Sequence, residues 1–276
     1  MTPPRRPGRA GAAAAAGWRL LCLLLLCVLS LQLYFVARIA LMALLAPQST
    51  TFQRSEAWRL LVDKQQIAWS QTWVDDDRIA SNLKRAVIAS EDAGFAEHDG
   101  VEWEALERAW EKNQRAETVA ERRNAQLQKQ LQPPAQKPAA RSAAAPPPRR
   151  AVEPKVVGGS TISQQLAKNL FLSGERTGFR KAQEFVLTLA LEALLDKRRI
   201  LEIYLNSVEW GEGVFGAQAA ARHYFRTDAA RLDATAAARL AVMLPAPKRF
   251  EKNPGSAYIT GRATSIVARM GAVALP

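Results

Sequence analysis

The chain has 276 residues, 48% of them hydrophobic, which is enough for one membrane anchor and one globular domain of ordinary size. Its net charge of +12 favours an anionic partner, namely nucleic acid, phospholipid head groups or a pyrophosphate, without choosing among them. The two cysteines, Cys22 and Cys27, both lie in an apolar N-terminal segment, which excludes a disulfide framework or a thiolate zinc site in the globular part.

The N-terminal part is dominated by an apolar segment over residues 20–46, which is uninterrupted from Leu20 to Ala37. A membrane-spanning helix needs about 20 mostly apolar residues, and the long side chain of Arg38 can reach the interface. The alternative is a cleaved signal peptide. However, the segment exceeds the usual apolar core of about 7–15 residues, and Ala43–Ala46 is a poor cleavage site. We therefore predict an uncleaved transmembrane anchor.

The charges around this anchor predict its orientation. No acidic residue occurs in residues 1–46, whereas the apolar segment is preceded by Arg5, Arg6, Arg9 and Arg19. By the positive-inside rule, residues 1–19 form a cytoplasmic basic arm and residues 47–276 an extracytoplasmic domain.

Two carboxylates end the first predicted helix of that domain. Residues 47–77 read as a polar connection with a short amphipathic piece, and apolar spacing predicts a helix over Ser81–Ser90. Glu91 and Asp92 follow it directly, with Phe95 and His98 close behind. A carboxylate at a helix end beside an apolar wall is well placed to have the raised pKa of a general base. The alternative is a solvated acid and a structural histidine.

The composition changes after the next helix, which is expected to begin at Val101 or Trp103. Its charged continuation to about Gln132 is compatible with a solvated helix. Residues 133–153 are rich in proline, alanine and arginine and cannot build a core. We predict a disordered insertion there.

A glycine pair at Gly158 and Gly159 precedes the next predicted helix, which a capping box of Thr161 and Gln164 would open. Glycines allow close backbone approach, and a helix N-terminus offers free N–H groups to an anion. Polar residues follow on one face at Gln165, Lys168 and Asn169. The segment therefore predicts an anion site, with an ordinary capped helix as the alternative.

A long helix is predicted over residues 180–196, apolar on most faces and therefore expected at the centre of the core. Arg180 and Lys181 share a face with Glu184 near its start. This group indicates a cationic cleft, with a surface salt bridge as the alternative. Further helices are expected at 198–206, 213–224 and 233–244, and no useful alternating pattern predicts strands, so the fold class is mainly α.

Three of these segments together resemble one family, the peptidoglycan glycosyltransferases, which occur as monofunctional enzymes and as a domain of bifunctional penicillin-binding proteins. The signatures are E-D-x-x-F-x-x-H-x-G at 91–100, G-x-S-T-x-x-Q-Q-x-x-K-N at 158–169 and R-K-x-x-E at 180–184. The resemblance covers about residues 50–113 and 155–270. Ser163 stands where threonine is common. No transpeptidase domain follows, so the chain resembles the monofunctional Gram-negative type.

The resemblance implies a lysozyme-like helical domain with one N-terminal transmembrane helix and a membrane-embedded jaw, in the inner membrane with the domain in the periplasm. It implies polymerisation of lipid II onto a growing glycan chain, with inversion at the anomeric carbon and release of undecaprenyl diphosphate. Other cell-wall synthesis or division proteins are conceivable partners. No nucleic acid is expected.

The resemblance also implies residue roles. Glu91 would be the general base, and Glu184 would orient cations or hold a divalent cation, Mg²⁺ or Mn²⁺, although no cofactor is definitely required. The pyrophosphate would be neutralised by Lys168, Arg180 and Lys181. The other expected substrate-binding residues are Asp92, Phe95, Ser160, Thr161, Gln164, Gln165 and Asn169.

Two other functions remain open at this point. A lysozyme-like lytic hydrolase would share the paired carboxylates and the cleft, but it has no pyrophosphate leaving group and so no need for the cations around Lys168 and Arg180. A membrane-anchored scaffold would have no requirement for Glu91. Because Glu91 and Glu184 are distant in sequence, the enzymatic hypothesis requires the fold to bring them to one cleft.

Overall fold

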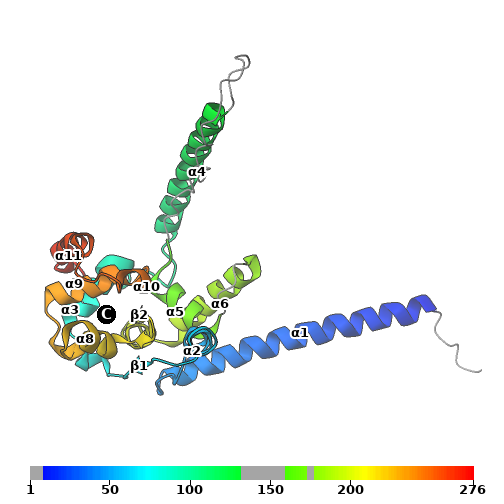
Figure 1. Ribbon diagram of the computed structural model, residues 1–276. Helices are drawn as coiled ribbons and strands as arrows, with labels where there is room; N and C mark the ends of the chain where they lie inside the picture. Colours follow the sequence, from blue (N-terminus) through cyan, green and yellow to red (C-terminus); the bar gives the residue numbers. More distant parts are fainter. Residues whose placement is uncertain (1–8, 132–158, 173–176) are drawn as a thin grey trace, which may run out of the picture. The chain divides into compact units, whose positions relative to one another are not determined.

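The computed structural model describes residues 9–131, 159–172 and 177–276. The chain divides into two compact units, Met1–Gly100 with Ile162–Pro276, and Val101–Thr161. Helices account for most of the described residues, as the apolar spacing predicted (Figure 1).

The first unit begins with the long helix α1, Arg9–Met42, whose part from Ala16 to Met42 is long and apolar enough to cross a membrane. The helix stops four residues before the predicted end of the anchor, at a turn. Its side chains are exposed along most of its length, but Ile39 and Met42 are 0% and 3% exposed. The last turn of α1 is therefore part of the core of the domain.

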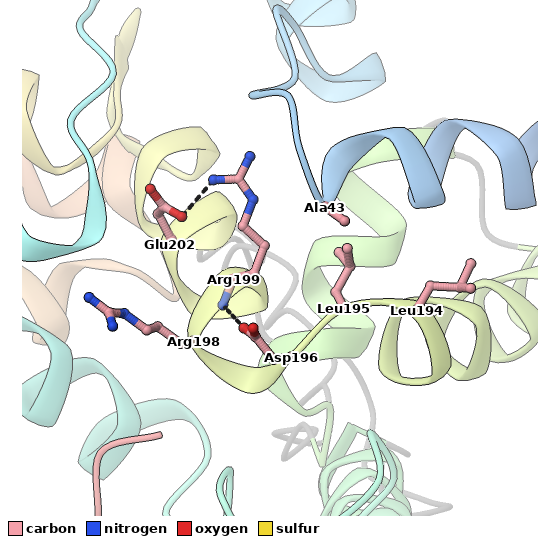
Figure 2. A pocket seen from close by; sticks show the side chains of 7 residues that line it. All are labelled: Ala43, Leu194, Leu195, Asp196, Arg198, Arg199 and Glu202. Carbon is pink, nitrogen blue, oxygen red and sulfur yellow. Dashed lines mark hydrogen bonds and ion pairs between the residues drawn. The ribbon is translucent and has the colours of Figure 1, made fainter.

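Two further contacts attach α1 to the domain. The side-chain amides of Gln32 and Gln183 exchange hydrogen bonds of 2.8 and 3.1 Å, which join α1 to helix α6, Gly178–Leu194. Arg199 donates from Nε to the Met42 carbonyl oxygen at 2.8 Å and from Nη1 to Glu202 at 2.6 Å. Figure 2 shows this junction, where a cavity of about 230 Å³ lies between the end of α1 and helix α7, Lys197–Ser207.

The core of this unit is built from two groups of helices. Helix α3, Ser81–Glu91, packs against α9, Ala234–Met243, and α11, Ala257–Met270. Helix α5, Ile162–Phe171, packs against α6, α7 and α2, Thr51–Lys64. Helix α2 is longer than the short amphipathic piece predicted there, because Thr50 and Gln53 form a capping box at its start.

A small sheet completes the unit, with strand order β1-β3-β2: β1 is Ser70–Gln71, β3 is Val214–Phe215 and β2 is Glu209–Gly211. Strands of two or three residues leave no alternating pattern, so the sequence did not predict them. Gly213 turns the chain between β2 and β3 with φ of 72°. The remaining elements of this unit are η1 (Asp76–Arg78), α8 (Ala217–Phe225), η2 (Ala229–Arg231) and α10 (Pro247–Phe250).

The second unit contains α4, Trp103–Leu131, a single helix of 29 residues. Exposed ion pairs such as Arg108–Glu104 and Arg115–Glu111 decorate it at i, i+4 spacing. This confirms the charged, solvated helix predicted to about Gln132. The insertion predicted over 133–153 lies outside the described residues.

The predicted position of α6 at the centre of the core is wrong. Only Glu184, Leu187, Thr188 and Leu191 are buried along this helix. Phe179 is 91% exposed, and Val186, Leu189 and Leu194 are each at least 40% exposed. The apolar composition indicated a helix that avoids water, which we interpreted as a helix in the core. In the structure, protein covers only one face of α6, and α1 packs beside this helix.

Candidate active site

Glu91 is the last residue of α3 and is held by a hydrogen-bond relay. Gln165 of α5 donates from Nε2 to Glu91 Oε2 at 3.0 Å, and the Tyr204 hydroxyl of α7 donates to Gln165 Oε1 at 2.9 Å. Burial raises the pKa of Glu91; the bonds from Gln165 and Ser90 oppose this, and the neighbouring Asp92 adds to it. The site therefore contains a positioned carboxylate whose pKa is shifted upward, as a general base requires.

Asp92, the next residue, supports the site from inside. Its side chain is 1% exposed, and its oxygens accept from His98 Nε2 at 2.8 Å and from the backbone N–H of Ile162 at 2.9 Å. The Gly100 N–H donates to His98 Nδ1, which fixes the tautomer with the proton on Nε2 when the ring is neutral. Asp92 thus fastens the start of α5 to the loop that follows Glu91.

This burial corrects part of the predicted substrate-binding set. Phe95 is 0% exposed and Asp92 5% exposed, so neither offers a surface to a substrate, and we reassign both to support of the site. Gln164 is also buried, at 6% exposed. Ser160 and Thr161 belong to the second unit.

A cavity of about 450 Å³ lies beside Glu91, and we call it the cationic cleft. Gln165, Lys168 and Asn169 of α5 line it, together with Arg180 of α6. The rest of its lining comes from Phe52, Ser55, Leu172, Val208, Glu209, Leu244, Pro245 and Pro247. The predicted anion-binding residues Lys168 and Arg180 therefore meet around one cavity, whereas Lys181 is not among the residues that line it.

Glu184 lies behind this cleft, 3% exposed. One of its oxygens accepts from Arg180 Nη1 at 3.0 Å, and the other accepts from Lys181 Nζ. Neither Glu91 nor Glu184 lines the cleft directly, but each contacts a residue that does, Gln165 and Arg180 respectively. The fold thus brings both predicted acids to the same cleft, one residue removed from its surface.

The Glu184 carboxylate does not fit a resident divalent cation. Both of its oxygens already face cationic side chains, whereas Mg²⁺ and Mn²⁺ prefer several oxygen ligands. The role of organising Arg180 and Lys181 fits these contacts.

Sequence reasoning missed two residues of this region. Tyr204 is fully buried and supports Gln165, but nothing in its local sequence separates it from an ordinary core tyrosine. Glu209 lines the cleft from β2, a strand too short to be predicted. Both residues reach the site only through contacts between elements that are distant in sequence.

Comparison with known proteins identifies the family. A family model described as Transglycosylase matches residues 60–131 and 147–271. Biosynthetic peptidoglycan transglycosylases are similar over most or all of the chain. The one from Paraburkholderia phytofirmans is 43% identical over 100% of both chains, and that of Burkholderia multivorans is 44% identical over 100% of this chain and 94% of the relative. The relative from Burkholderia thailandensis is 47% identical over 90% of this chain and 83% of its own.

The matched residues include α3, α5 and α6 with the relay and all of the cationic cleft except Phe52 and Ser55, and α1 supplies a helix that fits a membrane anchor. The chain therefore belongs to the transglycosylase family and is a peptidoglycan glycosyltransferase of the mainly α, lysozyme-like fold, with lipid II and the growing glycan chain as its substrates.

Proposed function

We propose that Glu91 is the general base of glycan polymerisation and that the cationic cleft binds the pyrophosphate of the lipid-linked donor, which is lipid II in the first coupling and the growing chain in later ones. The observation that carries this proposal is the arrangement around Gln165. This residue bonds Glu91 and lines the cavity that Lys168 and Arg180 also line. A base and an anion site therefore lie side by side, as the reaction needs.

The reaction then proceeds in one displacement. Glu91 takes the proton of the acceptor sugar 4-hydroxyl, whose oxygen attacks the anomeric carbon of the growing chain. The bond from that carbon to the pyrophosphate oxygen breaks, with inversion, and undecaprenyl diphosphate leaves with the bonding electrons. Lys168, Arg180 and Lys181 stabilise the negative charge that develops on the leaving group.

Glu184 keeps the cations of α6 in place. A buried acid that bonds both Arg180 and Lys181 holds two flexible side chains in fixed positions before the substrate arrives. Because the cations are already in place, no reorganisation energy is needed to position them when negative charge develops on the leaving group. We therefore assign Glu184 a positioning role rather than a proton-transfer role.

We further propose that α6 borders the lipid in a single-pass inner-membrane enzyme with its N-terminus in the cytoplasm. Gln32 lies ten residues before the end of α1, about 15 Å along the helix axis, and it bonds Gln183. The exposed apolar side chains of Phe179, Val186 and Leu189 on the same helix then have lipid as their natural surroundings. A substrate with a polyprenyl tail could reach the cleft from that side.

The test is polymerisation of purified lipid II by wild type and Glu91→Gln. Loss of a general base typically costs about 10²–10⁴-fold in rate. Glu97→Gln is the matched control, since Glu97 is an exposed acid in the loop that follows α3, and it should retain wild-type activity. Equal activity of wild type and Glu91→Gln would refute the mechanism. Release of fragments from pre-formed peptidoglycan without polymerisation would favour the lytic hydrolase.

A further inference from the structure

Glu209 is a buried acid that the proposed mechanism does not use. It opens β2 and is 6% exposed, yet it lines the cationic cleft. Its Oε1 atom has no hydrogen-bond partner among the described residues. Lys248 Nζ lies 3.4 Å from this oxygen and makes a shorter contact, 2.6 Å, with Glu56 Oε1.

A second buried atom in the cleft is also without a partner. Arg180 Nε has no hydrogen bond within the described part of the chain. Buried polar atoms are nearly always hydrogen-bonded, so each exception calls for a physical reason. Here the acceptor Glu209 Oε1 and the donor Arg180 Nε both lack a hydrogen bond, and both residues line one cavity of about 450 Å³. A polar ligand that bonds both would account for the two exceptions together.

We propose that Glu209 contacts the lipid-linked donor, which is lipid II in the first coupling, hydrogen-bonding as a neutral carboxylic acid to a hydroxyl or acetamido group of the sugar that adjoins the pyrophosphate. This inference rests on the proposed function of the cleft as the pyrophosphate site. The pyrophosphate is a diester with two charges, so an ionised Glu209 in the same cavity would repel it, whereas the neutral acid both donates and accepts a hydrogen bond.

The surroundings of Glu209 raise its pKa so that the carboxyl group gains or loses its proton near neutral pH. Burial, the largest influence, raises the pKa of Glu209 to about 7, Lys248 opposes this, and Glu56 and Glu251 add to it. Other charged or titratable groups on the neighbouring elements are Arg59 of α2, Lys168 of α5, Arg180 of α6, Glu212 after β2 and Tyr224 of α8.

The proposal predicts a pH-dependent KM. If only the protonated form binds lipid II, the apparent affinity falls with the protonated fraction. KM of the wild type should then rise about tenfold between about pH 6 and about pH 8. The pyrophosphate diester does not titrate in this range, so the change belongs to the enzyme.

The experiment measures kcat and KM for lipid II across this range in wild type, Glu209→Gln, Glu209→Ala and the exposed-acid control Glu97→Gln. The carboxamide of Glu209→Gln imitates the neutral acid, so its KM should stay near the wild-type value at low pH and remain flat. Glu209→Ala should show a raised and equally flat KM. Thermal unfolding of each variant in detergent checks that it is folded.

A Glu209→Gln variant that keeps the wild-type rise in KM would overturn this inference. So would a Glu209→Ala variant with unchanged KM at low pH. Either result leaves the proposed function intact as long as Glu91→Gln is inactive. An active Glu91→Gln enzyme would instead refute the proposed function itself, so the two failures are distinguishable.

Discussion

Replacing Asp92 by alanine should lower the stability of the protein strongly, although Asp92 is buried and does not contact the substrate. The carboxylate is buried and bonds both His98 and the N–H of Ile162. A hydrogen bond to a charged group contributes about 1.5–3 kcal/mol, and an unsatisfied buried N–H costs about 1–3 kcal/mol. Breaking a buried pair by removing one partner typically costs about 3–5 kcal/mol. We expect a loss in this upper range.

The same pair predicts a pH dependence of stability. The hydrogen bond from Asp92 is the largest influence on His98 and raises its pKa above the ordinary 6.5. A raised pKa in the folded state means that the stabilisation is fully present below about 6.5 and is lost as pH rises through the folded value. The Asp92→Ala variant should lack this decline in stability with pH.

Urea unfolding of the detergent-solubilised protein at about pH 6 and about pH 8 measures both effects. Asp63→Ala is the control, because Asp63 is 55% exposed and pairs with Arg59 at 3.4 Å, a contact worth less than about 1 kcal/mol. The reasoning is refuted if Asp92→Ala loses no more stability than Asp63→Ala, or if it keeps the wild-type pH dependence.

Two further predictions concern the anchor and the sheet. Gln32→Leu or Gln183→Leu alone should lower the free energy of unfolding by about 0.6–2 kcal/mol, because the remaining amide loses its partner in an apolar setting. The double variant should recover part of this loss, and additive losses in a thermal-unfolding cycle would contradict the pairing. Gly213→Ala should lower the free energy of unfolding by about 1–3 kcal/mol, since φ is 72° and the new Cβ would lie 2.0 Å from the Ala68 carbonyl oxygen. Gly255→Ala is the matched control in the same thermal-unfolding assay, because a Cβ at Gly255 would have no atom within 4 Å.

Apolar spacing predicted most helices because each helix in this fold has one face on the core. The helix predicted over Ser81–Ser90 is α3, Ser81–Glu91. The same reasoning misplaced α6, since apolar composition measures avoidance of water and does not show how much of a helix the rest of the protein covers. Helix α1 ends at Met42, four residues before the predicted end of the anchor, although the apolar composition continues past the turn that follows.

The site was only partly predictable for a different reason. Gln165 and Glu91 are 74 positions apart, and no local pattern reveals that the amide of one holds the carboxylate of the other. The motif positions identified the right helices, but burial decided which side chains face the cleft, and it removed Asp92 and Phe95 from the substrate-contacting set. Glu209 lies in β2, a strand of three residues that is too short to give a periodic signal.

The docked end of α1 has a consequence for protein production. Because Ile39 and Met42 fill the core and the Met42 carbonyl accepts from Arg199, the border between anchor and enzyme lies inside the helix and not in the polar linker after it. A version cut at residue 47 to gain solubility would lack the side chains of Ile39 and Met42 in the core, and Arg199 would lose the acceptor of its Nε atom. A soluble version is better begun at about Phe35, with the outward-facing apolar residues of that last helical stretch exchanged for polar ones.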